Sequence, residues 1–275
     1  HVSGYDAAVA NYLEYPDGPL GVMPEHLTSS LVRVQMLRYG ENPDQEAAFY
    51  SLGGPHGLVG LEQHHGKNLS YNNLLDLDGA LLCLAPFAGA KSAAVCIIKH
   101  TTPCGLAVDD SLAKAYQKAF ATDSTSAFGS VISVSRTVDG ETADLMSELF
   151  IECIAAPGFT EEAIAILTQK KNLRLLSYPS EDPEHFLLSY GQEPEARLLR
   201  SVYGGMLAQT PSVPPRYVQD DPEWKVVSAR EPSDEERDDL RFAWAAIFGV
   251  KSNAIVLARG GAVLGIGAGQ MSRVD

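Results

Sequence analysis

Residues 95–105 read VCIIKHTTPCG, an apolar run that ends on a lysine and a histidine. Four consecutive apolar residues, 95–98, are typical of a buried strand. Lys99 and His100 then lie where the strand passes into a loop, a place where α/β folds often build their sites. Pro103 and Gly105 predict a turn directly afterwards. We therefore expect a Lys-His pair at the end of a buried strand.

The chemistry that this pair favours is proton transfer. Histidine changes its charge near neutral pH, and the ammonium group of Lys99 disfavours protonation of the neighbouring His100 imidazole. A neutral imidazole is what a general base requires. The residue types alone leave an equal alternative, in which His100 is a polar loop residue and Lys99 is a solvated cation.

Strand and helix patterns alternate on both sides of this run, which predicts an α/β fold. Strands are predicted at residues 32–39, 95–98, 131–134, 151–155, 173–176, 255–258 and 263–266. Helices are predicted at residues 1–13, 74–84, 111–120, 142–150, 161–168 and 233–248. The last of them begins with a predicted capping box, in which Ser233 is the N-cap and Glu236 stands at N3. In the second of these helices, Asp76 and Asp78 lie near the predicted start, where carboxylates suit the helix dipole.

Composition limits the class of protein. The 275 residues are 45% hydrophobic, enough for one large domain or two smaller ones. A net charge of −14 opposes general nucleic-acid binding, and no apolar run is long enough to span a bilayer. Four scattered cysteines without a CxxC pair predict free thiols in a reducing compartment, with the cytoplasm as the default.

Several charged residues are candidates for ligand binding. Arg38 ends a predicted strand and presents a planar fork of donors to an anion, although an exposed strand-end cation is the alternative. Glu152 lies inside an apolar strand, where a carboxylate needs a partner. That partner is either a ligand donor or an internal arginine, and the sequence leaves both open.

The glycine-rich segment GIGAGQMSR, residues 265–273, is not a dinucleotide fingerprint. Gln270 stands where a third glycine belongs, and the segment follows a hairpin turn at Gly260 and Gly261 instead of the first strand of a βαβ unit. Glycine-rich backbone beside Arg273 still suits an anionic or planar ligand.

Seven motifs, taken together and in order, resemble one family. They are LRYGENP (37–43), KNLSYNN (67–73), KHTTPCG (99–105), DSTSAFG (123–129), AAPG (155–158), KSNA (251–254) and GIGAGQMSR (265–273). They are similar to the formyltransferase half of the bifunctional purine-biosynthesis enzyme in which AICAR transformylase is joined to IMP cyclohydrolase. The resemblance covers nearly the whole chain.

The resemblance implies an α/β fold of cytidine-deaminase-like three-layer subdomains with a mixed sheet. Residues 1–20 are then the tail of the preceding cyclohydrolase domain or a linker, 21–210 the first transformylase subdomain, and 211–275 the start of a second one. The chain is thus expected to be a fragment of a multifunctional enzyme. The cyclohydrolase activity would belong to an N-terminal domain that precedes it.

The implied activity is formyl transfer from 10-formyltetrahydrofolate to the 5-amino group of AICAR, in the de novo synthesis of IMP. His100 matches the proton acceptor and Lys99 the group that stabilises the transition state. Positions that match AICAR contacts are Arg38, Tyr39, Gly129, Glu152, Asn253 and Arg273. Lys171 matches a lysine near the nucleotide phosphate, and Val274 matches a position that lines the folate site.

The same resemblance implies a cytoplasmic homodimer with active sites at its interface. A structural potassium ion is a further candidate, and no other metal is expected.

Two alternatives to the formyltransferase function remain. A truncated module would bind AICAR without catalysis. A zinc nucleobase deaminase would need His-x-Glu and Pro-Cys-x-x-Cys, but Thr102 stands in place of the Glu and Ala107 in place of the second Cys.

Overall fold

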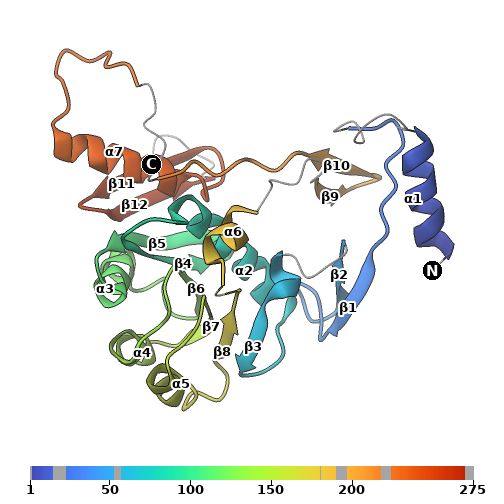
Figure 1. Cartoon of the computed structure of the whole chain (residues 1–275), viewed down its shortest axis with the longest axis horizontal. Helices are drawn as coiled ribbons and strands as arrows, with labels where there is room; N and C mark the ends of the chain where they lie inside the picture. The colour runs from blue at the N-terminus through green and yellow to red at the C-terminus, as the bar shows by residue number, and fades with distance from the viewer. Residues whose placement is uncertain are drawn as a thin grey trace.

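A computed structural model of the chain describes residues 2–14, 23–52, 57–179, 181–189, 197–217 and 224–269. Its centre is an eight-stranded mixed sheet (Figure 1). The strands lie in the order β11 (Ala254–Arg259), β12 (Ala262–Ala268), β5 (Thr102–Asp109), β4 (Ala93–Lys99), β6 (Ser130–Val134), β7 (Ile151–Ala156), β8 (Arg174–Ser177) and β3 (Glu62–His65).

Helices cover both faces of this sheet, so the predicted three-layer α/β fold is confirmed. One face packs against α2 (Tyr71–Leu84), α6 (Pro183–Leu188) and α7 (Asp234–Ile247), and the other against α3 (Leu112–Thr122), α4 (Gly140–Ser147) and α5 (Glu161–Leu167). Strand β4 is buried on both sides from residue 93 to residue 98. Burial on both faces explains its unbroken apolar sequence.

The remaining elements lie outside the eight-stranded sheet. They are α1 (Val2–Glu14), the hairpin of β1 (Val32–Leu37) and β2 (Ala47–Ser51), the hairpin of β9 (Leu198–Val202) and β10 (Gly205–Gln209), and two 3₁₀ turns at Gly57–Gly60 and Ala85–Phe87. The sequence patterns missed β2, β3, β5, α6 and the β9–β10 hairpin. None of the described helices is both long and apolar enough to cross a membrane.

The pairing directions decide which strand ends meet. Strand β4 runs antiparallel to both of its neighbours, β5 and β6, whereas β6, β7 and β8 run parallel. The carboxyl end of β4 therefore lies at the same edge as the amino ends of β6, β7 and β8. The rule that sites lie beyond the carboxyl ends of parallel strands does not describe this edge.

The predicted turn at Pro103 and Gly105 is wrong. The chain turns at His100 and Thr101, and both predicted turn residues lie inside β5. Pro103 is accommodated because the β4–β5 register shifts next to it, a position that tolerates proline. Gly105 is needed for packing, since a β-carbon there would overlap the backbone oxygen of Ala119 on α3.

The predicted dipole role of Asp76 and Asp78 is also wrong. Helix α2 begins three residues earlier than predicted, because Ser70 caps it and forms a capping box with Asn73. Its first turn contains no acidic residue. The two carboxylates thus lie further along the helix, where the dipole has little effect.

Residues 254–268 extend the same sheet. Strand β12 pairs with β5 at Ala262 and Ala107, and the backbone N–H of Val108 donates to Gly261 O at 2.8 Å. Helix α7, capped by the predicted Ser233–Glu236 capping box, packs beside them. The boundary predicted between residues 210 and 211 stays a prediction.

A candidate site at one edge of the sheet

The sheet register brings several of the sequence-predicted residues to one edge. Lys99 ends β4, Gly129 directly precedes β6, and Glu152 lies at the start of β7. Because Ile98 pairs with Val131, these three strand ends are adjacent. At the other side of β5, the ends of the β11–β12 hairpin face the same way, which places Asn253 at this edge too.

The turn that carries the proposed base has an unusual backbone. His100 and Thr101 have φ angles of 53° and 60°, in the left-handed region. For residues other than glycine this conformation costs roughly 1–2 kcal/mol each. Lys99 is partly buried and His100 is exposed, so neither is enclosed in the core. The turn is therefore accessible, and its conformation needs support from elsewhere in the fold.

Asp76 on α2 supplies part of that support. The backbone N–H of Thr101 donates to Asp76 Oδ1 at 2.7 Å. Burial raises the pKa of the Asp76 carboxyl, while the backbone N–H groups of Thr101 and His100 and the Lys99 ammonium act in the opposite direction. Sequence reasoning missed this contact because residues 76 and 101 lie on different elements.

Lys251, just before β11, contacts the side chain of Thr101 in the turn. Its Nζ donates to Thr101 Oγ1 at 2.8 Å. Two residues further on, Asn253 is exposed, and its backbone oxygen accepts from Gly269 N at 3.1 Å. The KSNA motif thus meets the Lys-His turn, 150 residues away in sequence, and the first part of the glycine-rich segment contacts the KSNA motif.

Lys99 connects the turn to the small-residue segment before β6. Its ammonium group donates to the backbone oxygen of Phe128. The next residue, Gly129, has a φ of 74°, which favours glycine, and its N–H donates to Phe150 O at 2.7 Å. The Lys99 side chain therefore contacts the backbone of this small-residue segment directly.

The partner of Glu152 is an internal arginine. The Arg174 guanidinium pairs with the Glu152 carboxylate, and its Nε also donates to Lys67 O at 3.3 Å. Arg174 is only 9% exposed. It was not among the predicted site residues, although one signal was present: a cation at the start of an apolar strand needs a partner as much as an embedded acid does.

Other predicted residues lie apart from this cluster. Arg38 and Tyr39 follow β1, and the guanidinium carbon of Arg38 lies 5.5 Å from the centre of the Tyr39 ring. Within the described ranges, no hydrogen bond or ion pair joins them to the Lys99 turn. Lys171 is exposed in the turn that precedes β8. Arg273 and Val274 lie outside the described residues.

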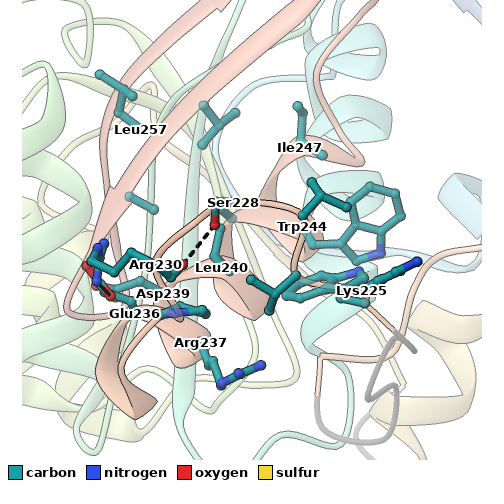
Figure 2. Close-up of a pocket in the computed structure, with 17 residues that line it drawn as sticks. Lys225, Ser228, Arg230, Glu236, Arg237, Asp239, Leu240, Trp244, Ile247 and Leu257 are labelled. Atoms are coloured by element: carbon teal, nitrogen blue, oxygen red, sulfur yellow. Dashed lines mark hydrogen bonds and ion pairs between the residues drawn. The ribbon is translucent and has the colours of Figure 1, made fainter.

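A pocket of about 790 Å³ lies elsewhere, between α7, residues 224–232 and β11 (Figure 2). The Trp224 and Trp244 rings lie edge to face, 6.5 Å apart, on one side of it. On another side, Arg230 forms an ion pair with Glu236 at 2.8 Å. None of the predicted site residues lines this pocket, so its size does not identify it as the site.

The cysteine in the central motif is a partly buried free thiol. Burial, followed by the charge of Asp123, raises the pKa of the Cys104 thiol to about 11. Within the part of the chain that the structure describes, no group of three or more His, Cys, Asp or Glu side chains is arranged to hold a metal ion.

Fold and site together define a three-layer α/β protein with a polar, charged cluster at one open edge of its sheet. Comparison with known sequences is more specific. All 275 residues match the model of the AICARFT/IMPCHase bienzyme family, and the chain belongs to this family.

Similar curated proteins carry the name bifunctional purine biosynthesis protein PurH. The protein from Anoxybacillus flavithermus is 44% identical over 276 residues, which cover 100% of this chain and 51% of the relative. The protein from Cyanothece sp. is 45% identical over 275 residues, with the same coverage. The chain spans about half the length of the curated relatives it matches.

Proposed function

We propose that this chain acts in purine biosynthesis and carries the formyltransferase activity of its family. In this proposal it transfers a formyl group from 10-formyltetrahydrofolate to the 5-amino group of AICAR. The observation that carries the proposal is the sheet register, which gathers Lys99, His100, Gly129, Glu152 and Asn253 at one edge. Family membership over residues 1–275 supports it.

The proposed chemistry begins with a poor nucleophile. The amine of AICAR is conjugated with its ring, so a base must remove a proton as the nitrogen attacks the formyl carbon. His100, exposed on its turn, takes that proton. The attack forms a new C–N bond and a tetrahedral oxyanion.

Lys99 acts on the second half of the reaction. A preorganised cation stabilises the oxyanion, or the ammonium donates a proton to the departing folate nitrogen. The bond between the formyl carbon and that nitrogen then breaks, which releases tetrahydrofolate and formylated AICAR. The hydrogen bond from Lys99 to Phe128 O favours a fixed position for the ammonium group.

The remaining residues bind substrate in this proposal. Asn253 offers a donor and an acceptor to the carboxamide of AICAR, and Gly129 and Glu152 line the same edge. Arg38 and Lys171 suit the phosphate, since cations with several donors bind dianions well. Tyr39 and Arg273 complete the nucleotide contacts, and Val274 lines the folate site.

The test is a formyl-transfer assay with purified protein, AICAR and 10-formyltetrahydrofolate, together with calorimetry of AICAR binding. His100→Ala should lower kcat by about 100-fold or more and leave AICAR binding nearly intact. His185→Ala on α6 is the matched control and should keep wild-type activity.

Each alternative has its own signature in the same experiment. AICAR binding without formyl transfer by the wild-type chain would favour a non-catalytic binding module. Stoichiometric zinc with base deamination would favour the deaminase. If His100→Ala keeps full activity, the proposed base is wrong.

Other expectations from the family resemblance also stay proposals. We expect a homodimer with active sites at its interface, a cytoplasmic location and a structural potassium ion. Light scattering with purified protein tests the dimer, and the potassium dependence of the formyl-transfer rate tests the ion.

A further inference from the structure

We propose that Asp76 is a positioning residue, which holds the His100–Thr101 turn and so aligns the proposed base with the Asn253 segment. The inference rests on the proposed function for its meaning in catalysis. Its structural part, the support of the turn by α2, stands on the contacts alone.

The backbone of the turn adopts a conformation that needs support. Two consecutive residues other than glycine adopt left-handed φ angles, at His100 and Thr101. Such conformations persist only where the surrounding structure supports them. The direction of the His100 side chain depends on this backbone, so a relaxed turn would move the imidazole.

A contact with α2 supports the turn. Asp76 Oδ1 accepts from the Thr101 N–H at 2.7 Å, and a partly buried carboxylate needs such a donor. Asp76 lies on α2, whose start is fixed by the Ser70–Asn73 capping box. One helical turn further on, Gly79 lies close to the same residue: a β-carbon at Gly79 would be 3.6 Å from Thr101 Cα.

Thr101 makes a second contact, with Lys251. Its hydroxyl accepts from Lys251 Nζ at 2.8 Å, two residues before Asn253. Thr101 therefore joins α2 through its backbone and the KSNA motif through its side chain. A shift of this one residue changes the distance between the proposed base and the proposed carboxamide contact.

Asp76 acts through the backbone of the turn in this arrangement. Its carboxylate accepts from the Thr101 N–H, and among the described residues no hydrogen bond joins it to the His100 imidazole. This distinguishes it from an acidic group that orients an imidazole directly. An amide oxygen in the same place should serve nearly as well, because the role requires an acceptor and not a charge.

The experiment compares Asp76→Ala with Asp76→Asn in the purified full chain. Asp78→Asn is the matched control, since Asp78 lies on the same helix and makes no hydrogen bond to the turn. We expect Asp76→Ala to lower kcat by roughly 100-fold, as a misplaced catalytic group does, with little change in KM for 10-formyltetrahydrofolate. Asp76→Asn should stay within about tenfold of wild type.

A second readout does not depend on activity. Amide hydrogen exchange of Thr101 should become about tenfold faster in Asp76→Ala than in wild type, and should be unchanged in Asp76→Asn.

A second pair of variants covers the case in which Asp76→Ala does not fold. Thr101→Val should raise KM for AICAR several-fold by releasing Lys251, and Thr101→Ser should restore it.

The outcomes separate the two proposals. Wild-type kcat and unchanged exchange in Asp76→Ala would overturn the positioning role while the formyl-transfer proposal stands. An equal loss in Asp76→Ala and Asp76→Asn would also overturn it, because the charge would then be what matters. If wild type transfers no formyl group, the proposed function fails, and the exchange data still decide whether Asp76 supports the turn.

Discussion

Asp76 and Asp78 lie two positions apart on α2, and their surroundings give them different properties. Burial raises the pKa of both carboxyls. For Asp76 the backbone N–H of Thr101 and the Lys99 ammonium partly offset that effect, whereas burial is the only cause at Asp78. Ionised Asp78 therefore has no compensating contact among the described residues, and its charge is expected to destabilise the folded state.

Asp78→Asn should raise the free energy of unfolding at neutral pH. Because the pKa of Asp78 is raised in the folded state, the folded protein holds this proton more tightly than the unfolded chain does. The free energy of unfolding of the wild type then falls as the pH rises from 3.8, the pKa of Asp78 in the unfolded chain, to its higher pKa in the folded state. Above the folded pKa this loss of stability remains. Urea denaturation at about pH 7 and about pH 3 measures the difference.

The gain from Asp78→Asn should vanish at the lower pH, where the carboxyl is protonated in both states. A variant that is less stable than wild type at neutral pH would contradict this account. It would mean that the Asp78 carboxylate has a favourable electrostatic partner.

At the scale of elements, the contact between β5 and α3 shows why a glycine was misassigned. Gly105 follows Pro103 by two residues, and this spacing is common in turns. In the structure it lies in mid-strand, where α3 approaches so closely that the backbone oxygen of Ala119 occupies the space of a side chain. The glycine is required by packing between two layers, which no local pattern records.

Gly105→Ala should therefore lower the free energy of unfolding by at least about 3 kcal/mol, because the overlap is with backbone and cannot be relieved by a side-chain rotation. Gly265→Ala is the matched control: it is also a glycine within a strand, but nothing lies within 4 Å of its missing β-carbon. Chemical denaturation of both variants tests this, and equal effects would contradict it.

At the scale of the whole molecule, the edge of the sheet is held together by contacts between segments far apart in sequence. Arg174 on β8 pairs with Glu152, 22 residues earlier, and donates to the Lys67 oxygen, 107 residues earlier. It thereby joins β7, β8 and the KNLSYNN motif. If Glu152 contacts the substrate as proposed, Arg174 also sets the position of its carboxylate.

Arg174→Met should lower the free energy of unfolding by about 2 kcal/mol. This is less than the full cost of breaking a buried ion pair, because the Glu152 side chain is 34% exposed. Combined with Glu152→Gln in a double-mutant cycle, the coupling energy should be about 1 kcal/mol or more. Strictly additive single effects would show that the two side chains are not coupled.

The sequence by itself determined most of the helices and strands and predicted several of the polar residues that the structure brings to one edge of the sheet. The apolar run at 95–98, the Ser233 capping box and the glycine hairpin at Gly260 all depend on local spacing, and the structure confirms them. The free cysteines and the α/β class follow from composition and alternation in the same way. The apolar run, the capping box and the hairpin are local features, because each depends on residues that are neighbours in sequence.

Only the tertiary structure decided where the chain turns and which groups meet there. The antiparallel direction of β4 brings its carboxyl end to the amino ends of β6 and β7, and no local pattern states that direction. The contacts of Thr101 with Asp76 and Lys251 span 25 and 150 residues. Such contacts depend on how the layers pack, because hydrogen bonds and burial act between residues that are neighbours in space and not in sequence.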